Sequence, residues 1–301
     1  MLKIVFFATP ELAVGVLDAL CLSSEVLAVV TMPDKPRERG GQMTMTPVKK
    51  RALELGLAVF EPLNPKEGDF VEAMERLAPD LFIVFAYGHI LRKNLLDVPR
   101  LGSVNIHTSL LPYYRGAAPI ERAILAGEVE TGISIMKMDI GMDTGGVYAV
   151  ERVQIPSDMD AIQLRAELAR RSIPLLVRCI NEIEADELIP KEQDHSLATF
   201  APKIQKEELI LKCETKEQMS LKVRGLTTYG GVKFFLSSGE SLKVWKAKAV
   251  DHLAKKEIEV DQNRLYLRAL NGSLELLEVQ IEGKKKMSAR EFINGYASKI
   301  S

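Results

Sequence analysis

The feature that most constrains the fold is an alternation of two patterns in the first two-thirds of the chain. Runs rich in β-branched and aromatic residues, expected to be strands, cover 3–8, 26–32, 58–60 and 81–86, and helical patterns cover 10–23, 48–57 and 68–77. Strands separated by helices imply right-handed crossovers and a mostly parallel sheet covered on both faces. The predicted fold class is therefore α/β, an open, doubly wound, Rossmann-like sheet whose ligands bind outside the carboxyl ends of the strands.

A different pattern begins after residue 188. Residues 189–205 are polar, include Pro190 and Pro202, and show no helical or strand period, so we expect a linker there. Beyond it the sequence predicts a helix near 216–224 and short strands at 232–236, 242–250, 257–260, 264–270 and 274–281. Such a series of short strands indicates a small β-barrel, of which the oligonucleotide-binding (OB) barrel is the common case. The expected domains are thus residues 1–188 and 206–301.

Charge is divided unevenly between these parts. The net charge of the 301 residues is −1, but residues 203–301 contain 19 Lys and Arg against 13 Asp and Glu, which leaves −7 on the residues before them. A basic C-terminal part attached to an acidic body points to a nucleic-acid partner.

Other features exclude several classes of protein. No apolar stretch approaches the roughly 18 residues needed to span a bilayer, and the chain opens on a strand pattern rather than a targeting segment, so we expect a cytoplasmic protein without a membrane partner. The turn at 7–12 lacks the glycines of a dinucleotide site. Cys21, Cys179 and Cys213 match neither a disulfide framework nor a zinc pattern, and the four histidines lack ligand spacing, so no metal is expected.

Residues 101–148 carry the candidate chemistry. Asn105 and His107 lie at the end of a predicted strand, where alternation places both on one face. Asp143 follows another strand pattern, and two strand-end loops of one sheet can converge. No cysteine is near, and Ser109 lacks the G-x-S-x-G turn of hydrolases, so the trio suits acyl transfer without a covalent enzyme intermediate. His107 would serve as base or as imidazolium donor, the Asn105 amide would donate to the oxyanion, and Asp143 would orient and charge-stabilise His107.

These motifs resemble the formyltetrahydrofolate-dependent formyltransferases. The resemblance rests on Asn105-x-His107, the run 109–112, the run 115–119, and Asp143 within "GMDTG", and it extends over essentially the whole length. It implies that Asn105, His107 and Asp143 form the catalytic trio and that the formyl donor is 10-formyltetrahydrofolate. It also implies a folate site formed by Ser109, Leu110, Leu111, Pro112, Asp139 and the strand end Phe85, Ala86, Tyr87 and Gly88.

Two regions resemble the branch of the family that formylates methionyl initiator tRNA for translation initiation. One is the loop at 31–52, in which Lys35, Arg37 and Arg39 are the expected RNA contacts and Arg39 matches the arginine that reads the end of the acceptor stem. The other is the C-terminal domain, where Lys284, Lys285 and Lys286 are expected to contact phosphates. We expect a monomer.

The chain departs from the family pattern at several positions, and other functions stay open. Ala8 and Gly146 replace a usual Gly and Asp, and residues 211–213 and 225–231 lack motifs that are common in the branch. We expect the barrel to survive these departures, whose effect on domain packing and tRNA contacts stays open. The nearest alternative is a formyltransferase that acts on glycinamide ribonucleotide or an amino sugar nucleotide. A formyltetrahydrofolate hydrolase and a folate- or tRNA-binding protein without turnover are the others.

Overall fold

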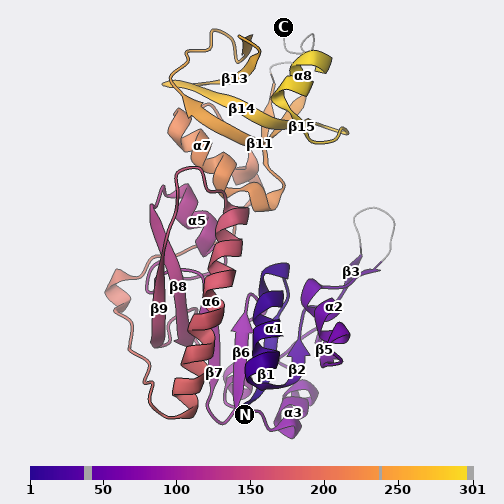
Figure 1. Cartoon of the computed structure of the whole chain (residues 1–301), viewed down its shortest axis with the longest axis vertical. Coiled ribbons are helices and arrows are strands. Elements are labelled where there is room, and N and C mark those ends of the chain that lie inside the picture. Colours follow the sequence, from indigo (N-terminus) through magenta and orange to yellow (C-terminus); the bar gives the residue numbers. More distant parts are fainter. Residues whose placement is uncertain (37–42, 237–238, 297–301) are drawn as a thin grey trace. The chain divides into compact units, whose positions relative to one another are not determined.

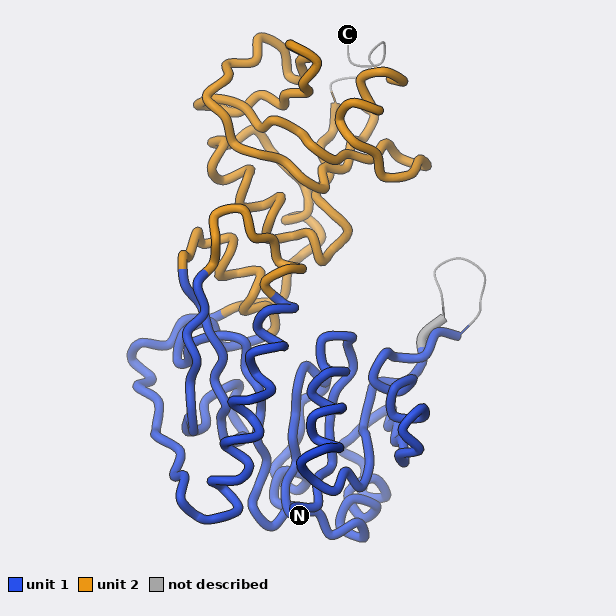
Figure 2. The backbone as a smooth tube through the Cα atoms, in the orientation of Figure 1, with its two compact units in different colours: residues 1–116, 130–154, 165–200 blue, residues 117–129, 155–164, 201–301 orange. Residues whose placement is uncertain are grey.

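The computed structural model describes residues 1–36, 43–236 and 239–296. It divides into two compact units (Figures 1 and 2). Unit 1 consists of residues 1–116, 130–154 and 165–200, and unit 2 of residues 117–129, 155–164 and 201–301. Residues 189–200 of the expected linker therefore lie in unit 1 and residues 201–205 in unit 2, while the domain limits at 188 and 206 stay a prediction.

In the described ranges, unit 1 is built on a seven-stranded sheet with the order β5-β2-β1-β6-β7-β8-β9. Neighbouring strands from β5 to β7 run parallel, whereas β7, β8 and β9 pair antiparallel. The strands are β1 (Lys3–Ala8), β2 (Glu25–Val30), β5 (Ala58–Phe60), β6 (Leu81–Phe85), β7 (Ser103–His107), β8 (Glu130–Lys137) and β9 (Val147–Gln154). A separate ribbon pairs β3 (Lys35–Pro36) with β4 (Met43–Thr44). The predicted α/β class is confirmed.

Helices cover both faces of this sheet. Alternate strand residues such as Val5 and Phe7 pack against α3 (Gly68–Leu77) and α4 (Lys93–Leu96). Ile4 and Phe6 point to the opposite face and are also fully buried. That second face carries α1 (Val14–Ser23), which follows the short helix η1 (Glu11–Ala13), together with α2 (Pro47–Glu54) and α6 (Ala161–Glu184), as Figure 1 shows. A further short helix, η2 (His195–Leu197), lies in the segment after α6.

Local signals explain where α2 begins. Pro47 occupies its first turn, where the missing N–H of proline costs no hydrogen bond. The Thr46 side chain accepts a hydrogen bond from the Lys49 N–H at 3.2 Å and so caps the helix.

None of the helices in the described ranges is long and apolar enough to cross a membrane.

Unit 2 holds an antiparallel sheet with the order β10-β11-β14-β13-β12, and β15 pairs with β14. The strands are β10 (Val232–Phe235), β11 (Ser241–Val250), β12 (Ile258–Asp261), β13 (Arg264–Ala269), β14 (Gly272–Ile281) and β15 (Met287–Ser288). The helices are α5 (Pro119–Leu125), α7 (Lys216–Gly225) and α8 (Ala289–Tyr296), with short turns η3 (Lys206–Leu209) and η4 (Thr227–Tyr229). The expected β-rich C-terminal domain is therefore present.

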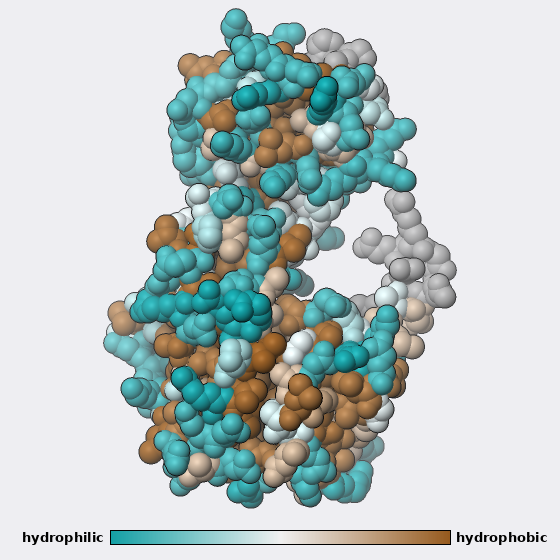
Figure 3. All heavy atoms as spheres, viewed as in Figure 1, coloured by the Kyte–Doolittle hydropathy of each residue, from teal (hydrophilic) through white to brown (hydrophobic). Residues whose placement is uncertain are grey.

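The core of unit 2 joins these helices to one side of the sheet. Met219 and Val223 of α7 and Phe292 of α8 are buried against strand residues such as Val244 and Leu276. The departures from the family pattern at residues 211–213 and 225–231 leave this core intact, because Leu211 and Leu226 are buried in it. On the face seen in Figure 3, hydrophilic side chains cover most of this unit.

Candidate active site

Strand β7 presents Asn105 and His107 on the same face of the sheet. Asn105 lies beside Val84 of β6 and Met136 of β8, and His107 lies beside Ser134 of β8. His107 is 5% exposed, whereas Asn105 is partly exposed. The titratable ring is therefore almost enclosed, and the neutral amide next to it can be reached from outside.

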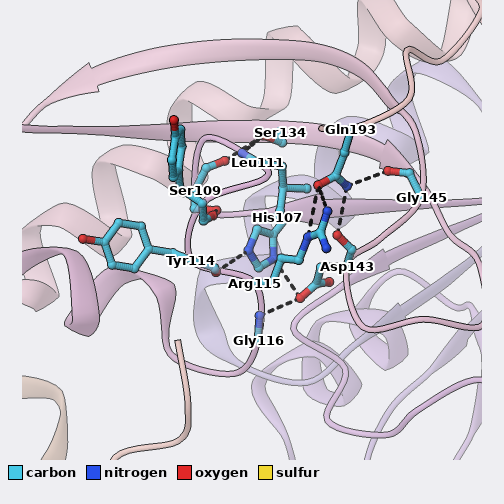
Figure 4. Close-up of polar contacts among 11 residues, drawn as sticks. His107, Ser109, Leu111, Tyr114, Arg115, Gly116, Ser134, Asp143, Gly145 and Gln193 are labelled. Carbon is cyan, nitrogen blue, oxygen red and sulfur yellow. Dashed lines mark hydrogen bonds and ion pairs between the residues drawn. The ribbon is translucent and has the colours of Figure 1, made fainter. Parts of the chain in front are cut away.

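The two nitrogens of His107 have different surroundings (Figure 4). Nε2 lies 3.0 Å from the carbonyl oxygen of Tyr114. Because a carbonyl can only accept, Nε2 carries the proton in this contact. Nδ1 lies 3.7 Å from Oδ2 of Asp143, which is too long for a hydrogen bond and close enough for an ion pair. A proton gained at Nδ1 would therefore face a carboxylate.

Asp143 reaches His107 by a route that the sequence did not indicate. Strand β8 runs antiparallel to β7, so that Lys137 at its end pairs with Val104 rather than with His107. The loop of residues 138–146 between β8 and β9 then returns along the sheet, with Asp143 in a left-handed conformation (φ 55°). The sequence led us to expect that two strand-end loops of one sheet can converge. The structure brings the two residues together through the loop of a β-hairpin.

Three consecutive residues connect His107 to Asp143. The carbonyl of Tyr114 accepts from His107, and the backbone N–H of Gly116 donates to Oδ2 of Asp143 at 2.8 Å. The intervening Arg115 is 4% exposed. Both members of the pair are thus held by the segment that follows the turn at 109–112.

Sequence reasoning missed two side chains here: Arg115, which belongs to this segment, and Gln193, which bonds to it. Arg115 was quoted only as part of a motif, and Gln193 falls in the expected linker. Their side chains bond to each other, and the Gln193 amide also donates to the carbonyls of Asp143 and Gly145 (Figure 4). A polar stretch without periodicity gives no local signal for such contacts, so only the three-dimensional arrangement reveals them.

The expected folate residues at 109–112 form a turn held on β8. Ser109 is fully buried, and its hydroxyl donates to the Tyr113 carbonyl at 2.6 Å. The hydroxyl of Ser134 donates to the Ser109 carbonyl at 2.7 Å and accepts from the Leu111 N–H at 3.0 Å. The side of the turn formed by Leu110, Leu111 and Pro112 is partly exposed. Ser134, another residue that the sequence did not single out, therefore positions this turn.

The expected folate residues after β6 differ in exposure. Phe85 and Tyr87 are each 2% exposed, and burial raises the pKa of Tyr87 to about 12. Ala86 and Gly88 are exposed and have positive φ angles of 50° and 103°. Of these four residues, Ala86 and Gly88 therefore present surface to a ligand.

The loop that carries Asp143 also presents apolar surface. Ile140 is 78% exposed and Met142 is 58% exposed. Asp139, itself exposed, accepts hydrogen bonds from the Gly141 N–H and the Thr144 hydroxyl and so stabilises the loop from within. The described residues contain no group of three or more His, Cys, Asp or Glu side chains that could hold a metal ion.

The expected RNA contacts lie in two places. Lys35 lies on β3, whereas Arg37 and Arg39 lie outside the described residues. The base of the β3-β4 ribbon is anchored by Lys49, whose Nζ lies 2.7 Å from carboxylate oxygens of both Asp34 and Glu61. In unit 2, the run Lys284, Lys285 and Lys286 is exposed, and Nζ of Lys286 lies 5.0 Å from the ring centroid of Trp245.

Comparison with known proteins supplies independent findings. Residues 2–180 match the model of the formyl transferase family, and residues 203–297 match that of the formyl transferase C-terminal domain. A methionyl-tRNA formyltransferase of Dictyoglomus turgidum is 40% identical over 308 residues, which cover 99% of this chain and 98% of the relative.

Two solved structures share the fold. An N-formyltransferase from Helicobacter canadensis, in complex with folinic acid and dTDP-3-aminofucose, superposes with a TM-score of 0.69 at 17% identity and covers 95% of this chain and 100% of its own. A phosphoribosylglycinamide formyltransferase from Streptococcus pneumoniae has a TM-score of 0.52 at 25% identity, and covers 61% of this chain and 99% of its own.

Proposed function

Because this chain belongs to the formyl transferase family in both of its parts, we propose that it transfers the formyl group of 10-formyltetrahydrofolate to the free amino group of methionyl initiator tRNA. The product is N-formylmethionyl-tRNA, which begins translation. The observation that carries the proposal is the 40% identity to a methionyl-tRNA formyltransferase along the whole chain, the basic C-terminal part included. We further propose that the protein acts as a monomer in the cytoplasm.

The described residues fit a folate as formyl donor. A flat pteridine needs apolar surface with backbone polar groups at its edge. Ile140 and Met142 offer exposed apolar side chains beside Asp143, and Ala86 and Gly88 expose main chain at the end of β6. The turn at 109–112 would complete the folate site. The donor supplies an activated formyl carbon, and the chain supplies the groups that orient it and handle the proton.

The catalytic trio then takes three different roles. His107 accepts a proton from the attacking amine at Nδ1, because Nε2 is already committed to the Tyr114 carbonyl. Asp143, 3.7 Å from that nitrogen, stabilises the charge that His107 gains. Asn105 donates its amide N–H to the formyl oxygen as negative charge develops there. His107 then gives its proton to the folate nitrogen as the bond between that nitrogen and the formyl carbon breaks. In this scheme the ring is oriented by a backbone carbonyl, and Asp143 acts through charge.

The RNA is held by basic residues other than the trio. Lys284, Lys285 and Lys286 contact phosphates, and Lys35, Arg37 and Arg39 contact the end of the acceptor stem. Phosphate contacts add affinity without sequence preference, whereas contacts near the aminoacyl end position the amine.

One assay tests the proposal and its nearest alternative. The protein is incubated with 10-formyltetrahydrofolate and, in parallel, with methionyl initiator tRNA, glycinamide ribonucleotide or an amino sugar nucleotide. We expect formylation of the methionyl-tRNA amine. Formylation of a small amine alone would establish the alternative. The Helicobacter canadensis enzyme, which has the same fold as this chain, is in complex with such an amine, dTDP-3-aminofucose. Release of formate without any acceptor would indicate a hydrolase.

A further inference from the structure

Gln193 is a buried residue that the proposed mechanism does not use. It is 8% exposed. Its amide oxygen accepts from Nε and Nη2 of Arg115 at 3.2 and 2.7 Å, and its amide nitrogen donates to the carbonyls of Asp143 and Gly145 at 2.9 and 2.7 Å. A carboxamide has two N–H donors and two acceptor lone pairs, so all four positions are used. If the amide were turned over, its N–H groups would face the N–H groups of Arg115 and its oxygen would face the two carbonyl oxygens. These partners therefore fix the orientation of the amide.

The partners of Gln193 belong to the two segments that hold the catalytic pair. The carbonyls of residues 143 and 145 flank Thr144 in the hairpin loop, and Arg115 lies between the residues that bond to His107 and Asp143. The 3.7 Å separation between Nδ1 of His107 and Oδ2 of Asp143 therefore depends on how these two segments are held together. Gln193 connects them directly (Figure 4).

The backbone around Gln193 is held on both sides. Lys191 exchanges hydrogen bonds with Val147, at the start of β9, at 2.8 and 2.9 Å. Thr199 accepts from the Tyr114 N–H through its hydroxyl at 2.8 Å and from the Arg115 N–H through its carbonyl at 2.9 Å. The segment from 191 to 199 is thus a strap that bonds to the hairpin at one end and to the Tyr114–Gly116 segment at the other.

We infer that Gln193 is a positioning residue for formyl transfer, which holds the carboxylate of Asp143 where it stabilises protonated His107. This inference rests on the proposed function. It assigns Gln193 no contact with either substrate. Its loss should therefore lower the rate of the chemical step and leave substrate affinity nearly unchanged.

A purely structural role makes a different prediction. A buried guanidinium needs an acceptor, and Gln193 supplies one to Arg115. Gln193→Glu separates the two roles, because glutamate still accepts from Arg115, as an ion pair, but has no N–H for the carbonyls of Asp143 and Gly145. A structural role alone predicts full activity for this variant. A positioning role predicts a folded protein with a slow chemical step.

The experiment compares the full-length wild type with Gln193→Glu and Gln193→Met, and uses Gln262→Glu on an exposed turn as the matched control. We expect kcat to fall about tenfold or more in both Gln193 variants, with KM for the folate and for the tRNA within about threefold. The control should match the wild type. A Gln193→Glu variant that is folded and retains wild-type kcat would overturn the inference, as would failure of both variants to fold.

A double-mutant cycle shows whether Gln193 acts through Asp143. In an Asp143→Asn background the carboxylate is already absent, so Gln193→Glu should lower single-turnover rates by less than about twofold. An undiminished tenfold loss in that background would mean that Gln193 acts elsewhere, and the inference would be wrong.

A second readout does not require activity. Hydrogen–deuterium exchange over residues 139–147 should rise in both Gln193 variants and not in Gln262→Glu, because two hydrogen bonds that hold this loop are lost. Unchanged exchange there would count against the inference. If the wild type itself formylates no methionyl-tRNA, the proposed function fails, whereas the exchange result still decides whether Gln193 holds the loop.

Discussion

At the scale of single residues, His107 shows that the tautomer of the ring is set by the backbone. A carbonyl acceptor at Nε2 leaves Nδ1 as the basic nitrogen, and Asp143 faces that nitrogen without a hydrogen bond. In a serine-protease triad, by contrast, the carboxylate accepts a hydrogen bond that the N–H of the histidine ring donates. In the proposed mechanism, the pair therefore stabilises a charge that appears on His107 during the reaction.

Replacement of His107 tests this role. His107→Ala should lower kcat by at least about 10²-fold, the usual scale for a positioned acid or base, because the ring that takes up the proton beside Asp143 is removed. Circular dichroism and thermal unfolding should show an intact fold. His252→Ala, in unit 2, is the matched control, since that ring stacks on Tyr266. Near-wild-type turnover of His107→Ala would remove this residue from the mechanism.

At the scale of secondary-structure elements, the β8-β9 hairpin determines where Asp143 lies, and it depends on a glycine. A Cβ added at Gly145 would collide with the backbone carbonyl of Lys137. Because the obstacle is main chain, the loop itself would have to move.

Gly145→Ala should therefore lower kcat by about ten- to a hundredfold through misplacement of Asp143, and should destabilise the protein by about 1–3 kcal/mol. Steady-state kinetics and chemical denaturation measure the two effects. Gly68→Ala, at a position where an added Cβ meets nothing within 4 Å, should leave both unchanged. Wild-type kcat in Gly145→Ala would show that the loop can shift without a cost to catalysis.

An ion pair in unit 2 links stability to pH. Arg122 donates two hydrogen bonds to the carboxylate of Glu208, at 2.6 and 2.9 Å, and this contact, with the Gln205 N–H, holds the pKa of Glu208 below its ordinary value of 4.5. A carboxyl group whose pKa is lowered in the folded state stabilises the protein at pH values above its ordinary pKa. This increment of stability is lost as the pH falls through the folded-state pKa. The side chains are 20% and 33% exposed, so solvent screening keeps the increment small.

Glu208→Gln should thus destabilise the protein by about 0.5–1 kcal/mol near neutral pH. The difference in the free energy of unfolding between Glu208→Gln and the wild type should shrink as the pH falls below 4.5, the ordinary pKa of glutamate, and should vanish in stronger acid. Denaturant unfolding across the acidic range measures it, with the exposed Glu207→Gln as the control. A difference that stays constant down to the lowest pH would mean that Glu208 contributes by packing and not by charge.

How far the sequence could predict these features depends on whether a local signal exists. Helix α3 begins and ends at the predicted residues, and Asn105 and His107 lie at the end of a strand, as predicted, so that alternation places both on one face. The antiparallel pairing of β8 carries no such signal, because strand direction is decided by tertiary pairing and not by the pattern within the strand. The strap around Gln193 was expected to be a linker because side chains that bond to distant backbone groups leave no period in the sequence.

At the scale of the whole molecule, the uneven charge suggests that RNA affinity is carried mainly by the basic C-terminal part. Replacing both Lys284 and Lys285 by Ala should raise KM for methionyl-tRNA several-fold and lower the slope of log affinity against log salt by about 1 to 2, because fewer counterions are released. KM for the folate should not change. Lys255→Ala with Lys256→Ala removes the same charge from another exposed turn and is the control. An equal effect of both pairs would show attraction by overall charge and no defined contact.

The two units are interleaved along the chain, which passes between them after residues 116, 129, 154, 164 and 200. Unit 2 includes α5, whose Leu125 packs against a core formed largely by residues after 200. During synthesis, residues 117–129 leave the ribosome long before the partners that bury them. The same interleaving means that recombination at a single crossover in the gene cannot exchange the whole of one unit for a homologous one, because each unit consists of three separate stretches of the chain.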